Sequence, residues 1–269
     1  MFLDVAHRAA RAARPFWRSK ILLDIAIIYK SIGDYTKFTK FINEALEHIN
    51  KLGDEEYVLL TGDVIYDLLY VEENDVAYDL IVKYTEKISD FDPELILRAY
   101  KEISENLAEY GFFHDAIAYA INAVSLLERK AEILHIRANM IVSRARKGSS
   151  SWNQERLSPR ARLYSRDYLA SIMARRRDMY KTELRVRPLR REATEIMLTA
   201  SEFLARVVFE VLDLILRKED KEVLNECMEL IRENDDAFDP DSLSSLYLLV
   251  GCWFLEHDNF DEARKYSDR

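Results

Sequence analysis

The stretch YLLVGCWFLEHDNFDEA, residues 247–263, reads as two helical segments joined by a short polar turn. Its first part carries Tyr247, Val250 and Phe254 at spacings of three and four residues, which places them on one face of an α-helix. After the polar turn, Ala263 opens a second amphipathic segment. The stretch therefore predicts two antiparallel helices that pack against each other.

The same pattern recurs elsewhere in the chain. YGFFHDA (110–116) resembles HDNFDEA (257–263), and FDPEL (91–95) recurs as FDPDS (238–242), both at an offset of 147 residues. A spacing of 39 residues separates further equivalent positions, namely Phe38 and Ala77, Ala77 and Ala116, and Leu224 and Ala263. Self-similarity at a fixed period is typical of stacked supersecondary units. We therefore expect a helix pair about every 39 residues.

The recurring FDP segments carry the signals of a helix start. Asp92 and Asp239 can accept hydrogen bonds from the free N–H groups of a first helical turn. Pro93 and Pro240 follow at the first helical position, where no N–H group is required. These residues predict helices that begin at Pro93 and Pro240.

Three copies of this unit resemble the tetratricopeptide-type helical repeat. Residues 247–263, 22–46 and 100–124 carry the large, small and aromatic positions of the family's first helix, its aromatic turn residue and its small residues in the second helix. The copies at 57–88 and 207–233 are degenerate. The resemblance covers most of the chain outside residues 144–191. It implies an all-α fold, an α-solenoid of antiparallel helix pairs.

The resemblance also implies a function. Members of the family usually bind an extended peptide or a helix of another protein in a groove that the first helices line. We therefore expect a non-enzymatic interaction scaffold. By register, the candidate groove residues are Lys20, Ile27, Lys30, Arg98, Lys101 and Glu105.

Composition excludes several classes of protein. Six Gly and five Pro in 269 residues are too few for a turn-rich sheet protein. Cys227 and Cys252 are predicted to be buried or half-buried free thiols, and they make no zinc spacing. No apolar run is long enough to span a bilayer, and no nucleotide, metal or nucleophile motif occurs. We predict a cytoplasmic protein that is not an enzyme and needs no cofactor.

One segment has the opposite charge from the rest. Residues 144–191 contain 15 Lys and Arg against four acids, a net charge of +11, whereas the remainder has a net charge of −20. We divide the chain into N-terminal repeats with a capping helix (1–147), a basic loop with a long Arg-rich helical insert (148–187) and C-terminal repeats (188–269). The insert is interpreted as part of one repeat with an expanded turn. The second helix of this repeat is expected to extend up to Pro188.

The centre of the insert is MARRRDMY, residues 173–180, with candidate binding residues Arg175, Arg176 and Arg177. Helical geometry places Arg176 among apolar residues such as Met173 and Tyr180. Three interpretations remain open. The arginines pair with an acidic wall of this chain (Glu102, Glu105 and Glu109), with an acidic protein partner, or with nucleic acid. In the last case, Trp152, Tyr164 and Tyr168 offer rings for stacking.

The ends of the chain suggest two further features. Residues 3–14 are expected to form a lone capping helix. The final helix is short and is expected to leave an apolar face (Phe260, Ala263 and Tyr266) partly uncovered, which makes self-association through this edge possible.

Overall fold

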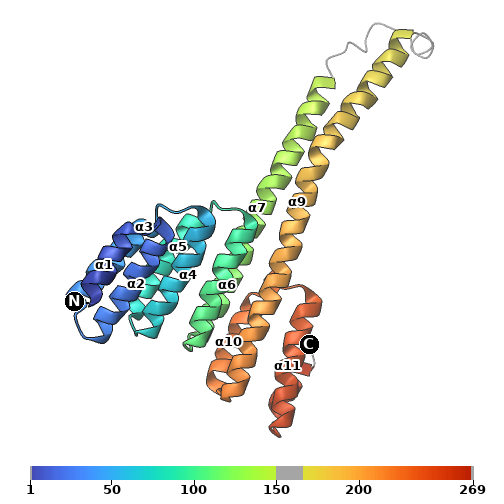
Figure 1. Ribbon diagram of the computed structural model, residues 1–269. Coiled ribbons are helices and arrows are strands. Elements are labelled where there is room, and N and C mark those ends of the chain that lie inside the picture. The colour runs from blue at the N-terminus through green and yellow to red at the C-terminus, as the bar shows by residue number, and fades with distance from the viewer. Residues whose placement is uncertain (1, 150–165, 268–269) are drawn as a thin grey trace. The chain divides into compact units, whose positions relative to one another are not determined.

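The computed structural model describes residues 2–149 and 166–267, and this part of the chain is all helical, with no strand (Figure 1). The side chains of residues 2, 146–149, 166–172, 174–176 and 267 lie outside the description. The helices are α1 (Phe2–Ala12), α2 (Pro15–Ser31), α3 (Tyr35–Ile49), α4 (Asp54–Tyr70), α5 (Asn74–Ile88), α6 (Pro93–Glu109), α7 (Phe113–Ser149), α9 (Arg166–Lys218), α10 (Lys221–Glu233), α11 (Pro240–Glu256) and α12 (Phe260–Ser267). A 3-10 turn, η2 (Asp235–Ala237), precedes α11. The all-α prediction is confirmed.

The helices pack in neighbouring pairs along the chain. Helix α2 packs against α3, α4 against α5, and α11 against α12, while α1 packs against α2. We call α2, α4, α6, α9 and α11 the first helices, because each is followed by a short turn and a second helix. The first helices α2 and α4 also contact each other, as do α4 and α6. The first three pairs therefore share one layer of first helices.

The turn inside each pair has the same backbone conformation. A residue with positive φ follows each first helix, at Gly33 (80°), Glu72 (61°), Gly111 (89°), Glu219 (56°) and Asp258 (56°). In four of the turns, the next residue donates its backbone N–H to the carbonyl five residues back, as Phe112 does to Leu107 at 2.8 Å. This bond satisfies a carbonyl that the helix end would leave free. The positions 33, 72 and 111 are 39 residues apart, as are 219 and 258.

These turns lead to a prediction about stability. Gly111→Ala is expected to lower the free energy of unfolding by about 1 kcal/mol, because an L side chain is strained at positive φ. No atom lies within 4 Å of the added Cβ, so backbone strain is the only cause. Glu219→Gly is expected to raise the free energy of unfolding by about 0.5 kcal/mol, because it removes the same strain from an exposed residue. Urea unfolding measures both, and shifts of equal sign would contradict the shared turn.

The predicted helix starts are confirmed. Asp92 Oδ1 accepts a hydrogen bond from the Leu95 backbone N–H at 3.1 Å, and α6 begins at Pro93. Asp239 Oδ1 accepts one from the Ser242 backbone N–H at 2.9 Å, and α11 begins at Pro240. The caps fix the entry of both first helices.

The positions related by 39 residues all lie in the core. Their side chains are at most 4% exposed, and the positions are Phe38, Ala77, Ala116, Leu224 and Ala263. In α7, Ala116, Ala120 and Ala123 are completely buried, which confirms the predicted small-residue face. The copy at 57–88, which looked degenerate, forms the pair α4 and α5 and contains some of the most buried residues of the chain, including Ile65 and Tyr84.

Helices α7 and α9 run through two compact units. One unit comprises Met1–Val124 and Ser201–Arg269, and the other comprises Ser125–Ala200. The second unit buries an apolar face made by Leu127, Ala131, Ala138, Val186, Ala193, Ile196 and Ala200. It contains 18 Lys and Arg against eight Asp and Glu, a net charge of +10, and leaves −19 for the first unit. The two charge blocks of the sequence therefore nearly coincide with the two structural units.

Pro188 does not end a helix, contrary to the expectation from the sequence. Helix α9 continues through it from Arg166 to Lys218. Val186 and Ala193 are completely buried on either side of Pro188, so the buried face continues across the proline. Packing of that face overrides the local penalty of a proline inside a helix.

Three further expectations have mixed outcomes. Cys227 is buried as expected, but Cys252 is exposed, because it lies on the solvent face of α11. Ala263 and Tyr266 are covered rather than free, since Tyr266 stacks on Phe254 with 5.8 Å between ring centroids. Only Phe260, 66% exposed, remains of the predicted uncovered face. None of the described helices combines the length and the apolar character that a membrane crossing requires.

Candidate functional site: the face of the first helices α2, α4 and α6

After its first turn, α4 reaches solvent along a single narrow stripe. The stripe consists of Leu59, Asp63, Tyr66, Asp67 and Tyr70, and every other residue from Val58 to Leu69 is buried. Leu59 and Tyr66 are each 36% exposed and Tyr70 is 64% exposed. Helices α2 and α6 both contact α4. This α4 stripe is therefore the exposed part of a surface shared by three first helices.

Three carboxylates gather on this surface with one lysine. Lys20 Nζ of α2 lies 3.0 Å from Asp63 Oδ2 of α4. Burial, followed by the negative charges of Asp63 and Asp24, raises the pKa of Asp67 to about 6, and Lys20 opposes this only in part. Burial also raises the pKa of Asp24. The surface thus holds more negative charge than its own lysine neutralises.

The raised pKa of Asp67 predicts a pH-dependent effect on stability. The folded protein binds the Asp67 proton more tightly than the unfolded chain does. Protonation of Asp67 therefore stabilises the fold; this contribution is complete below about pH 4 and is lost as the pH rises through about 6. Asp67→Asn is therefore expected to raise the free energy of unfolding at pH 7.5 by about 1 kcal/mol, a figure that allows for solvent screening of a partly exposed group.

Urea unfolding at pH 7.5 and pH 4 tests this prediction, and the difference between variant and wild type should disappear at pH 4. The exposed Asp235→Asn serves as a control that leaves stability unchanged. A destabilising Asp67→Asn at pH 7.5 would show instead that Asp67 has a favourable internal partner.

Helix α6 brings a fourth carboxylate against α4. Glu102 Oε1 accepts a hydrogen bond from Arg98 Nε at 3.2 Å, whereas its Oε2 is buried without a hydrogen bond. The carboxylate fits there because Gly62 of α4 has no side chain, and a Cβ at this position would collide with Oε2. Asn106 Nδ2 donates to the Gly62 carbonyl at 3.1 Å. Burial raises the pKa of Glu102, and Arg98 opposes this shift.

Aromatic side chains complete the surface. The ring of Tyr66 on α4 meets that of Tyr110, just beyond the C-terminal end of α6, with 5.5 Å between centroids. Tyr66 is thus held in place while more than a third of it stays exposed. Large, rigid aromatic groups beside charges are typical of protein-binding surfaces.

The structure places four of the six predicted groove residues in ion pairs on these helices. Lys20 pairs with Asp63, Arg98 with Glu102, and Lys101 with Glu105 at 2.8 Å. Ile27 is half-buried on α2.

Lys30 has a different environment. It pairs with Glu73, which precedes α5, and its Nζ lies 4.5 Å from the centroid of the Tyr35 ring. Its side chain is only 14% exposed. Because Lys30 lies on α2 and Glu73 precedes α5, this ion pair joins two neighbouring helix pairs. The α4 stripe was not predicted from the sequence, although Leu59, Asp63, Tyr66 and Tyr70 stand at a regular 4-3-4 spacing.

The predicted arginine cluster is described only in part. The side chains of Arg175 and Arg176 lie outside the described residues, as do those of Trp152, Tyr164 and Tyr168. Arg177 is exposed, and so are Met173 (73%) and Tyr180 (66%). Met173 and Tyr180, which were expected to lie on an apolar face around Arg176, are therefore exposed to solvent and do not pack in the core. Glu102 and Glu105 of the expected acidic wall already pair within α6.

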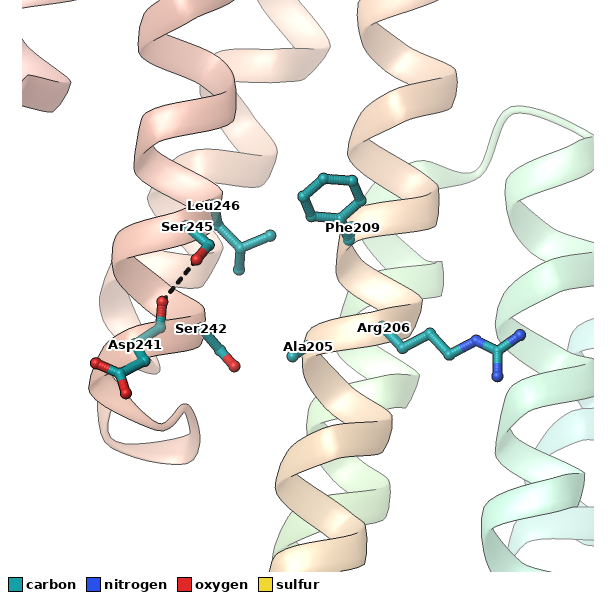
Figure 2. A pocket seen from close by; sticks show the side chains of 7 residues that line it. All are labelled: Ala205, Arg206, Phe209, Asp241, Ser242, Ser245 and Leu246. Atoms are coloured by element: carbon teal, nitrogen blue, oxygen red, sulfur yellow. Dashed lines mark hydrogen bonds between the residues drawn. The ribbon is translucent and has the colours of Figure 1, made fainter.

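A second surface lies between the first helices α9 and α11. A groove of about 350 Å³ is lined by Ala205, Arg206, Phe209, Asp241, Ser242, Ser245 and Leu246. Figure 2 shows the side chains of Phe209 and Leu246 pointing toward one another across it, whereas the guanidinium group of Arg206 points away from α11. Arg206 pairs with Glu210 at 3.0 Å, and the Ser245 hydroxyl donates to the Asp241 carbonyl at 2.8 Å. The groove can therefore hold an apolar side chain.

Within residues 2–149 and 166–267, no group of three or more His, Cys, Asp or Glu side chains is placed to hold a metal ion. The described surfaces present carboxylates, aromatic rings and an apolar groove on first helices. Groups of these kinds are typical of surfaces that bind a polypeptide. Compared with known proteins, the chain matches no family model, no curated protein and no solved structure.

Proposed function

We propose that this protein is a non-enzymatic α-solenoid scaffold of tetratricopeptide-like helix pairs, which binds a helix or peptide segment of a partner protein along the first helices. The α4 stripe carries this proposal. It presents exposed Leu59, Tyr66 and Tyr70 seven and four residues apart, a spacing with which one helix contacts a partner in a groove. Its carboxylates lie between these apolar groups and add polar contacts.

The carboxylates support the proposal through their energetics. Asp67 is partly buried beside Asp63 and Asp24, and its raised pKa means that its ionised form destabilises the fold near neutral pH. Groups that cost stability at a surface are typical of binding and catalytic sites, where function opposes stability. A cationic side chain from a partner would supply the missing counter-charge.

Selection from a displayed library of random helical peptides tests the proposal. We expect enriched peptides whose binding weakens at least about 10-fold in the Tyr66→Ala/Tyr70→Ala variant, because exposed tyrosines at an interface centre typically contribute more than about 1 kcal/mol. The matched control is Tyr35→Ala, which removes another exposed tyrosine that lies on the second helix α3. The proposal fails if no peptide is enriched, or if binding does not depend on Tyr66 and Tyr70.

The positively charged unit Ser125–Ala200 supports a second candidate function, the binding of nucleic acid by residues 144–191. Arg177, Arg187 and Arg191 are all exposed on α9, and cations on one helix attract phosphates. Titration of a generic RNA and a generic DNA duplex should then show binding that weakens steeply with added salt. No binding to either probe at low salt would rule this function out.

A further inference from the structure

Helix α9 carries an exposed stripe of three apolar and three basic residues. Its members are Met173, Arg177, Tyr180, Leu184, Arg187 and Arg191, at spacings of 4-3-4-3-4 residues. All six are exposed, including Tyr180 at 66% and Leu184 at 56%. This α9 stripe follows the spacing of one helix face that contacts another helix. The buried face of α9 is a different one, which contains Val186, Ala193 and Ile196.

Among the described residues, only one of the three cations of the α9 stripe has an ion-pair partner. Arg177 and Arg187 form no ion pair among the described residues, while Arg191 pairs with Glu195 of its own helix at 2.7 Å. Pairs of this kind on an exposed helix are weak and readily exchange partners. The unit as a whole has a net charge of +10.

The α4 stripe has the complementary chemistry. Apolar Leu59, Tyr66 and Tyr70 share it with the acidic Asp63 and Asp67, and Leu59, Asp63, Tyr66 and Tyr70 have a 4-3-4 spacing. Further carboxylates flank it, from Asp24 on α2 and from Glu102 on α6. It belongs to a unit with a net charge of −19.

We propose that the α9 stripe of one copy of this chain docks along the α4 stripe of a second copy. This inference rests on the proposed function, since it uses the same face and names its occupant. Apolar residues of the two stripes bury one another, and the arginines meet the carboxylates. Arginine is suited to this contact because its planar guanidinium group binds a carboxylate through two parallel hydrogen bonds.

The contact joins two different surfaces, so each pair of copies leaves one α4 stripe and one α9 stripe unoccupied. Such a head-to-tail contact continues to further copies unless the geometry closes a ring. Self-association should therefore grow with protein concentration. It should weaken at about 1 M salt, where the Debye length is about 3 Å.

Two charge-reversed variants test the docking by analytical ultracentrifugation at low salt. Variant A carries Asp63→Lys and Asp67→Lys, and variant B carries Arg177→Glu, Arg187→Glu and Arg191→Glu. Each variant alone is expected to associate at least about 30-fold more weakly than wild type, because like charges then face each other. Each should sediment near the monomer mass of 31.6 kDa. Variant A retains an intact α9 stripe and variant B an intact α4 stripe, and the two reversed stripes are also opposite in charge, so an equimolar mixture should associate again.

Matched controls separate the stripes from net charge. Asp235→Lys with Asp236→Lys makes the same charge change as variant A at exposed residues of the 3-10 turn. Lys181→Glu with Arg185→Glu and Arg190→Glu makes the same change as variant B on α9, but off the stripe. Both controls should still self-associate, and circular dichroism should show unchanged helix content in all variants.

The inference is overturned if wild type stays monomeric at low salt, if the off-stripe controls lose association to the same extent, or if variants A and B do not combine. A monomeric wild type whose selected peptides still depend on Tyr66 and Tyr70 would leave the proposed function intact and remove only the second copy as occupant. If peptide selection fails as well, the proposed function falls too.

Discussion

Tyr84→Ala is expected to lower the free energy of unfolding by about 3–5 kcal/mol, the range observed when a large buried aromatic side chain is removed. Tyr84 on α5 is completely buried. Its ring meets Tyr57 of α4 with 5.6 Å between centroids, and its hydroxyl donates to the Val58 carbonyl at 3.1 Å. Truncation therefore opens a cavity between the two helices of a pair and removes a buried hydrogen bond.

Urea unfolding followed by circular dichroism measures this loss. Tyr84→Phe keeps the ring and should cost only about 1 kcal/mol, the usual net value of one hydrogen bond. Tyr70→Ala makes the same chemical change on α4 at a residue that is 64% exposed, and it should cost no more than about 0.5 kcal/mol. Similar losses for Tyr84→Ala and Tyr70→Ala would contradict the packing of α4 against α5.

Pro188→Ala is expected to stabilise the unit Ser125–Ala200 by about 3 kcal/mol, the difference in helix propensity between the two residues. Pro188 lies inside α9, has no backbone N–H group and leaves the Leu184 carbonyl without its usual partner four residues on. Because Pro188 is exposed, its replacement removes little packing. The gain comes almost entirely from the backbone.

Hydrogen exchange of the amides from 184 to 192 should show greater protection in the variant, together with a higher melting temperature. Arg190→Ala, at an exposed position two residues away, serves as the control and should change neither. An unchanged exchange rate in Pro188→Ala would mean that α9 is interrupted at this point in solution.

Much of the fold follows from local signals in the sequence. The Asp-Pro pairs at 92–93 and 239–240 begin helices where expected, because capping depends only on neighbouring backbone groups. The 39-residue spacing places a positive-φ turn after each first helix, because one turn conformation closes each pair. A glycine marks the positive-φ position in the sequence only at Gly33 and Gly111. Glu72, Glu219 and Asp258 adopt positive φ without such a signal.

The candidate site could be predicted less well. Lys20, Arg98, Lys101 and Glu105 were placed on first helices by register, and they lie there. The carboxylate that pairs with Lys20 was not foreseen as its partner, because Asp63 lies 43 residues from Lys20 and on a different helix. Residues of α4 were missed because their repeat copy, at 57–88, is degenerate in sequence.

The sequence by itself determined the helix pairs, their period, their caps and the separation of positive from negative charge, since these depend on residues close to one another in the chain. Only the tertiary structure decided which face of α4 stays exposed, why Asp67 holds its proton up to a pH of about 6, and that α9 continues through Pro188. The physical reason is that burial, like-charge proximity and helix packing are set by neighbours in space, and these can compensate for or oppose what each local segment prefers.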